Sequence, residues 1–125
     1  MTIKLNHTIV SARDKHASAV FLTEILGLRQ PPVSFGPFMC VKVDNDVTLD
    51  FIDDDGSIVS QHYAFLVGES EFDQIFGRIK SRKLDYWGDP ARAKPGETYT
   101  WNGGRGVYFL DPAGHFLEIH TKPYF

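Results

Sequence analysis

The segment Gly104–His120 constrains the fold of this chain more than any other stretch of its sequence. Its residues 107–110 and 116–120 are rich in β-formers and predict two strands, and Asp111–Gly114 between them (Asp-Pro-Ala-Gly) is typical of a tight turn. Glu118 falls in the middle of the second strand. A carboxylate in an apolar strand is costly to bury without a partner. The segment therefore predicts a hairpin whose glutamate is met by polar residues from elsewhere in the chain.

The residues before this hairpin predict one order of elements that occurs twice. The first half reads as a strand over 3–10, a helix from the capping pattern Ser11–Asp14 to about Leu26, an extended edge segment at 30–33, and strands over 38–43 and 47–52. The second half reads as a strand over 61–67, a helix from the capping pattern 70–73 to about Lys83, a short extended piece at 84–87, a loop over 88–98, and the hairpin.

The helices are expected to bury one apolar stripe each. The first stripe would be Ala17, Val20, Phe21 and Ile25, with Gly27 ending the helix, and the second Phe72, Ile75, Phe76 and Ile79. The repeated order predicts an α+β fold of two βαβββ modules, residues 1–57 and 58–125, which form a curved mixed sheet around a cleft.

Composition restricts the cellular compartment and the class of partner that we expect for this chain. The net charge is −3 without a basic run, which argues against a nucleic-acid partner. Cys40 is the single cysteine and cannot form an internal disulfide, which favours a reducing compartment. The sequence shows no signal peptide and no apolar run of membrane-spanning length. We therefore expect a cytoplasmic protein with a small-molecule partner and no membrane partner.

The repeat brings four polar residues into one set. His7 and His62 lie in the first strand of each half, and Asp50 and Glu118 lie in the last. If the halves are related by a pseudo-twofold axis, equivalent positions converge on that axis. Two imidazoles with one or two carboxylates suit Fe²⁺, Mn²⁺, Zn²⁺, Ni²⁺ or Co²⁺ and leave open positions for a substrate. The sequence therefore predicts one divalent metal ion in the cleft.

These positions, together with the ending Gly-Val-Tyr-Phe-Leu-Asp-Pro-Ala-Gly-His-Phe-Leu-Glu118, resemble the vicinal oxygen chelate superfamily. That superfamily includes glyoxalase I, extradiol dioxygenases, fosfomycin-resistance enzymes and bleomycin-resistance proteins. The resemblance implies that His7, His62 and Glu118 are the metal ligands. Asp50 stands where a fourth carboxylate, normally glutamate, occurs; its side chain is one methylene shorter, so direct ligation and an orienting role both stay open.

The resemblance also implies roles for residues around the metal. Tyr108 stands ten residues before the glutamate, where its phenol could donate a hydrogen bond to a substrate oxygen. Asp50 or His120 could act as the base. Arg105, His120 and Trp101 are expected to contact the substrate. A homodimer is implied as well, and whether the modules pair within one chain or between two chains stays open.

We therefore expect a divalent-metal enzyme whose substrate chelates the metal through oxygen atoms, with lyase, isomerase or extradiol-dioxygenase chemistry. The alternative is a non-catalytic protein of the bleomycin-resistance type that sequesters a drug or metabolite. Fosfomycin resistance is disfavoured, because Ile9 replaces a hydroxylic residue of those enzymes and Gly103–Gly106 replaces a serine-containing loop.

Overall fold

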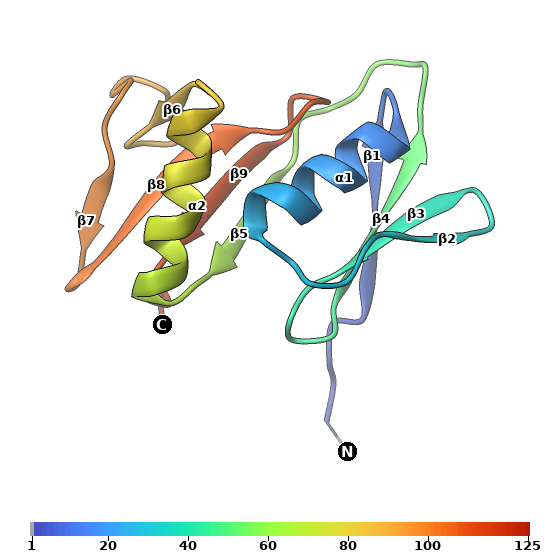
Figure 1. The fold of residues 1–125 in the computed structure, drawn as a ribbon, viewed down its shortest axis with the longest axis horizontal. Coiled ribbons are helices and arrows are strands. Elements are labelled where there is room, and N and C mark those ends of the chain that lie inside the picture. Colours follow the sequence, from blue (N-terminus) through green and yellow to red (C-terminus); the bar gives the residue numbers. More distant parts are fainter. Residues whose placement is uncertain (1) are drawn as a thin grey trace. The chain divides into compact units, whose positions relative to one another are not determined.

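The computed structural model describes residues 2–125 and contains two compact units, one ending at Val59 and the other beginning at Ser60. Each unit has one helix and its own mixed sheet (Figure 1). The predicted α+β class with two βαβββ modules is confirmed. Neither helix in the described part of the chain has the length and apolar character needed to cross a membrane.

The first unit is a four-stranded sheet with the helix α1 (Lys15–Leu26) packed on β3 and β4. Its strands are β1 (His7–Ala12), β2 (Val33–Phe35), β3 (Phe38–Lys42) and β4 (Thr48–Asp53), in the order β1-β4-β3-β2. The pair β1–β4 is parallel and the other pairs are antiparallel. The proline-rich segment leads into the edge strand β2, as its lack of amide donors requires.

The start of the chain differs from its prediction. β1 begins at His7 rather than at Ile3, and the side chains of Ile3 and Leu5 are exposed. The helix α1 is capped by Asp14, whose carboxylate accepts the amides of His16 and Ala17. Ser11 lies in β1 and is not the N-cap residue. Half of the predicted capping pattern is therefore wrong, while the carboxylate half is confirmed.

The buried face of α1 also differs from the predicted stripe. The buried residues are Ser18, Ala19, Leu22 and Ile25, which recur at helical spacing. Val20, which was expected inside, is 44% exposed. Two overlapping stripes fit the apolar pattern of this helix, and packing against the sheet selects the one that contains Leu22. The helix ends as predicted at Gly27, which has a φ of 70°.

The second unit is a five-stranded sheet with the helix α2 (Glu69–Ser81). Its strands are β5 (His62–Leu66), β6 (Tyr86–Trp87), β7 (Tyr99–Trp101), β8 (Gly104–Leu110) and β9 (Phe116–His120). The order is β5-β9-β8-β6, with β7 also paired to β8. The hairpin β8–β9 is confirmed, and the strand β7 was not predicted.

The helix α2 starts earlier than predicted and without the predicted capping box. Gly68 is its N-cap and makes no side-chain hydrogen bond. Glu69 and Glu71 in the first turn favour the helix by their charge near its N-terminus. Phe72, Ile75 and Ile79 are buried as predicted, whereas Phe76 is only half-buried.

Candidate functional site

The fully buried carboxylate of Glu118 is the centre of the polar cluster in the second unit. It lies on β9 between the parallel neighbour β5 and the antiparallel neighbour β8. Its oxygens accept hydrogen bonds from the phenols of Tyr99 and Tyr124, the latter at 2.9 and 3.1 Å. The Nε2 atom of His62 lies 3.1 Å from its Oε1 atom. The partners that the sequence required for this glutamate are therefore present.

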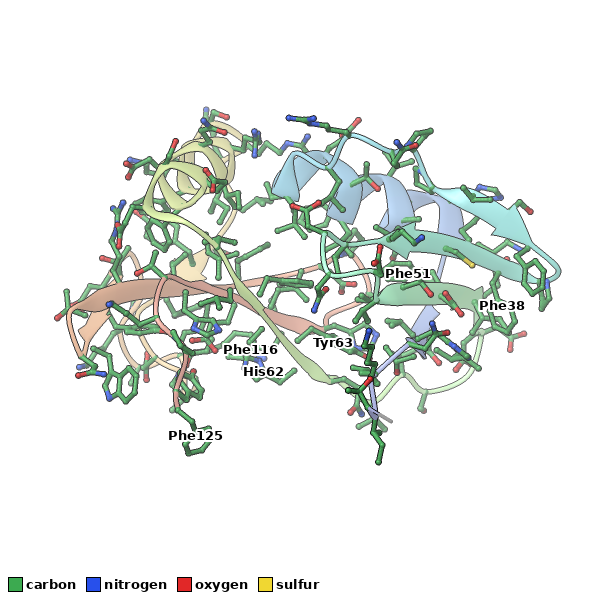
Figure 2. All side chains as sticks on the ribbon, turned by 90° about the horizontal axis from the view of Figure 1, so that it is seen from below. Phe38, Phe51, His62, Tyr63, Phe116 and Phe125 are labelled. Atoms are coloured by element: carbon green, nitrogen blue, oxygen red, sulfur yellow. The ribbon has the colours of Figure 1, made fainter. Side chains whose placement is uncertain are left out.

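His62 is held in one ring orientation. Its Nδ1 atom lies 3.0 Å from the backbone carbonyl of Phe116, and a carbonyl can only accept, so Nδ1 carries the proton. In the neutral ring, Nε2 then presents a lone pair to the Glu118 carboxylate. Either a second proton on the ring or a bound cation stabilises that arrangement. Figure 2 shows His62 and Phe116 together on the sheet face opposite α2.

His7 has the same local arrangement in the first unit. Its Nδ1 atom lies 2.8 Å from the Oδ1 atom of Asn6, which leaves Nε2 as the nitrogen without a bound proton in the neutral ring. The ring is exposed at the start of β1. Histidines that bind metals usually donate their other ring N–H to an oxygen acceptor, and both His7 and His62 do so here.

Asp50 is a buried carboxylate with an unsatisfied oxygen. It lies on β4 directly opposite Cys40 of β3 and is 9% exposed. Its Oδ1 atom is buried and has no hydrogen-bond partner among residues 2–125. Burial, together with the hydrogen bond to Asp50 and the charge of that carboxylate, raises the pKa of the Cys40 thiol to about 11. An unpartnered buried oxygen in a protein interior calls for a water, an ion or a ligand.

Tyr99 reaches Glu118 because of a glycine on the neighbouring strand. Tyr99 of β7 is paired with Gly106 of β8, and a Cβ atom at Gly106 would overlap the Tyr99 ring. Only glycine therefore allows the phenol to lie across β8 and donate to the carboxylate. The sequence prediction missed Tyr99; the signal was the isolated glycine inside a strand, which often marks a close approach of this kind.

Tyr124 was missed as well, because it lies in a tail that forms no helix or strand. Its ring lies 5.2 Å from the ring of His120 and 5.6 Å from that of Trp101. The Nδ1 atom of His120 lies 2.7 Å from the carbonyl of Lys122, which fixes the turn that returns the tail to the site. The tail residue Tyr124 is therefore tied to the site by two predicted residues, His120 and Trp101.

The three phenols around Glu118 stay protonated. Burial raises the pKa of Tyr99, Tyr108 and Tyr124, and the negative charge of Glu118 raises each of them further. Each phenol is therefore a hydrogen-bond donor at neutral pH rather than a base. For Tyr108 this agrees with the donor role that the resemblance implied.

A cavity of about 400 Å³ adjoins these phenols. Its lining is largely aromatic, and consists of Gly88, Pro90, Tyr99, Thr100, Trp101, Tyr108 and Tyr124. The ring of Tyr108 stacks on that of Phe116 at 5.1 Å and lies 5.8 Å from that of His62. The cavity has the size and apolar lining of a small-molecule site, with convergent hydroxyl groups at one end.

Arg105 has a different environment from the one expected of an anion-binding residue. Its guanidinium forms ion pairs of 2.8 Å with Glu69 and with Asp73, both on α2. These pairs satisfy its charge and raise its pKa. A substrate contact by Arg105 stays a prediction, and the two ion pairs weigh against it.

The expected metal ligands are divided between the two units, with His7 in the first and His62 and Glu118 in the second. Among residues 2–125, no three His, Cys, Asp or Glu side chains form a group that could hold a metal ion. The donor chemistry nevertheless fits a divalent cation: in its neutral form each histidine has a lone pair on Nε2, Glu118 is a buried carboxylate, and Asp50 has an orphaned oxygen.

The comparisons with known proteins agree with this fold. No family model matches the chain. It is 62% identical to the solved structure named Oxidase ChaP-H1, with a TM-score of 0.96 and coverage of 98% of each chain. Oxidase ChaP-H2 is 57% identical, with a TM-score of 0.95 and coverage of 99% of this chain and 97% of that one.

More distant relatives include Glutathione transferase FosA of Serratia marcescens, which is 29% identical over 127 residues, 97% of this chain and 82% of that protein. The lactoylglutathione lyase of Agrobacterium tumefaciens shares the fold, with a TM-score of 0.70 at 20% identity over 94% of this chain and 92% of that one. The two-module architecture, the segment around Glu118 and these relatives lead to one assignment. The chain belongs to the vicinal oxygen chelate superfamily.

Proposed function

We propose that this protein is a divalent-metal-dependent oxidase that acts on a small aromatic substrate carrying neighbouring oxygen atoms. The observation that carries the proposal is the contact between His62 and the buried Glu118, in which the ring orientation leaves a lone pair aimed at a carboxylate. The 62% identity to a protein named an oxidase supports the reaction class. Within the open choice of lyase, isomerase and dioxygenase chemistry, this relative favours oxidation.

The residues that would hold the metal are His7, His62 and Glu118. Asn6 and the Phe116 carbonyl orient the two rings, and Tyr99 and Tyr124 orient the carboxylate. When bound, the metal would supply a Lewis acid and, as Fe²⁺, one-electron chemistry with dioxygen. Asp50 would act as a fourth ligand or through a water, and its orphaned oxygen supports either role.

The chain's own residues would bind and polarise the substrate. The aromatic lining of the cavity suits a planar ring, which Trp101 and Tyr108 would contact. Tyr108 keeps its proton at neutral pH, so it would donate a hydrogen bond to a substrate oxygen as negative charge develops there. Asp50 and His120 remain the proposed bases.

Metal content and oxygen uptake test this proposal. Protein purified without chelator and reloaded with Fe²⁺ should consume oxygen when it is mixed with catechol or 2,3-dihydroxynaphthalene. His62→Ala should abolish the uptake, whereas His16→Ala, on the exposed surface of α1, should retain it. Stoichiometric metal without oxygen uptake would point to lyase or isomerase chemistry, and absence of metal would point to a sequestering protein.

A second candidate is thiol transfer, which the 29% identity to Glutathione transferase FosA favours. Ile9 and the segment Gly103–Gly106 depart from the pattern of fosfomycin-resistance enzymes, so we rank thiol transfer below oxidation. Mixing the metal-loaded protein with glutathione and fosfomycin distinguishes the two: an oxidase leaves both reagents unchanged, and a transferase yields their adduct.

A further inference from the structure

The long loop between β6 and β7 holds one arginine in an unusual position. Arg92 has a φ of 58°, in the left-handed region that non-glycine residues seldom occupy. The loop enforces this conformation: the carboxylate of Asp89 accepts the amides of Ala93 and Lys94, and its carbonyl accepts the amide of Arg92. Backbone strain of this kind persists where the surrounding structure fixes it, and it is concentrated at binding sites.

The strained backbone places a cation over the aromatic residues beside the site. The guanidinium carbon of Arg92 lies 5.3 Å from the ring centre of Phe116 and 5.5 Å from that of Trp87. Phe116 in turn stacks on Tyr108, which lines the cavity, and lies 6.0 Å from the ring of His62. One of the two rings beneath Arg92, that of Phe116, is therefore also the ring that contacts Tyr108 and the candidate ligand His62.

Arg92 also has no anionic partner. Among residues 2–125, no carboxylate forms an ion pair with its guanidinium. Arg105, on β8 of the same unit, shows the contrast, since Glu69 and Asp73 occupy its donors. A guanidinium that contacts the face of an aromatic ring still has N–H donors, which lie in its own plane and can bind an incoming anion.

From these three observations we propose that Arg92 is a specificity-determining residue, which binds an anionic group on the substrate ring other than the oxygens that face the metal ligands. The inference rests on the proposed function for the aromatic nature of the substrate. It adds that the preferred substrate carries a carboxylate, or another acidic oxygen, in addition to the reacting oxygens.

Binding of two matched rings tests the proposal. 6-Hydroxy-2-naphthoate and 2-naphthol share one ring system and one hydroxyl, and only the former carries a carboxylate remote from that hydroxyl. Calorimetric titration of the full chain, metal-free and loaded with redox-inert Zn²⁺, should show that the naphthoate binds roughly tenfold or more tightly, as one charge-assisted hydrogen bond requires.

Arg92→Met should remove this preference in both metal states and leave the affinity for 2-naphthol unchanged. Arg92→Lys should retain part of it, because the point charge remains without the planar fork. Lys94→Met is the matched control on the same loop and should bind both rings as the wild type does. A urea midpoint equal to that of the wild type would show that each variant is folded.

The outcomes separate this proposal from the one on which it rests. If both rings bind the wild type equally, or if Arg92→Met weakens both rings alike, the role of Arg92 is refuted while an aromatic substrate survives. If neither ring binds, the aromatic substrate class fails and the role of Arg92 fails with it. Oxygen uptake is a separate measurement, so it tests the proposed oxidation whatever the two rings and the Arg92 variants show.

Discussion

At the scale of single residues, the site depends on the hydrogen-bond partners of the fully buried Glu118 carboxylate. Glu118 has three partners, and two of them are phenols that no strand pattern would have associated with it. Leaving a buried acceptor with fewer partners costs about 1–3 kcal/mol. The residues that position these donors should therefore affect folding stability as strongly as the residues that donate.

Gly106 is the clearest such residue. Gly106→Ala would push the Tyr99 ring away from β8 and break its bond to Glu118, so we expect the free energy of unfolding in urea to fall by about 1–3 kcal/mol. In a Tyr99→Ala background the same change should cost much less, because the space is then open. Gly77→Ala on α2 is the control: nothing lies near its Cβ, and alanine should stabilise the helix by about 0.5–1 kcal/mol. Equal costs of Gly106→Ala in both backgrounds would contradict this account.

The thiol of Cys40 should titrate late in the folded protein. Its pKa is raised from the usual 9.0 to about 11, so at pH 8 alkylation by iodoacetamide should be roughly a hundredfold slower than in the urea-unfolded chain. Between these two values the folded state keeps a proton that the unfolded state loses, so this group lowers stability as pH rises from 9 to 11. Asp50→Asn removes a charge that opposes the thiolate and should shift the alkylation midpoint downward. An alkylation midpoint near pH 9 in the folded wild type would show that the fold does not raise the pKa of Cys40.

The residues of the site could be predicted only in part from the sequence. The repeated pattern placed His62 and Glu118 in one ligand set, but the parallel pairing of the first and last strands that brings them into contact was not predicted. Tyr99 and Tyr124 could not be found this way. One requires the close approach at Gly106 and the other a tail without regular structure, and neither leaves a periodic signal in the sequence.

At the scale of elements, prediction succeeded where apolar periodicity was strong and failed at boundaries. The stripe Phe72, Ile75 and Ile79 has a single reading, and α2 buries it as expected. The helix α1 admits two stripes, and its contacts with β3 and β4 decide between them. The strand β7 was missed because its three residues are held by pairing with β8 rather than by a pattern of their own.

Attachment of α2 to its sheet includes the ion pairs of Arg105. Both carboxylates are mostly exposed, and the pKa of Glu69 is lowered chiefly by its hydrogen bond to Arg105. A lowered carboxylate pKa contributes stability above its ordinary value of 4.5, and that contribution is lost as pH falls through the folded-state value. The urea midpoint of Arg105→Gln should therefore lie below that of the wild type at pH 7 and low salt, and the difference should vanish in acid or in 1 M salt, where charges are screened within about 3 Å. A difference that persists in acid would instead indicate the lost contact of the Arg105 guanidinium with the Phe72 ring.

At the scale of the whole molecule, the ligand set that we propose requires both modules. His62 and Glu118 come from the second unit and His7 from the first, so neither unit alone carries both ligand histidines and the glutamate. The two modules contribute equivalent residues to this ligand set. Each supplies one histidine from its first strand, and their last strands supply Asp50 and Glu118. The implied homodimer stays a prediction, because such a site can be completed within one chain or between two.

This division makes metal binding a test of cooperation between the modules. The full chain should bind about one equivalent of Zn²⁺ or Fe²⁺, and binding should raise the melting temperature because the folded state alone presents the site. His7→Ala, in the first unit, should lose metal as completely as His62→Ala, in the second, whereas Asp50→Asn should lose about 10- to 100-fold in affinity if that carboxylate orients a ligand. His16→Ala, on the exposed face of α1, should keep full stoichiometry. If His7→Ala retains a full equivalent while His62→Ala retains none, the metal is held by the second unit alone, and the equivalence of the two modules in forming the site is wrong.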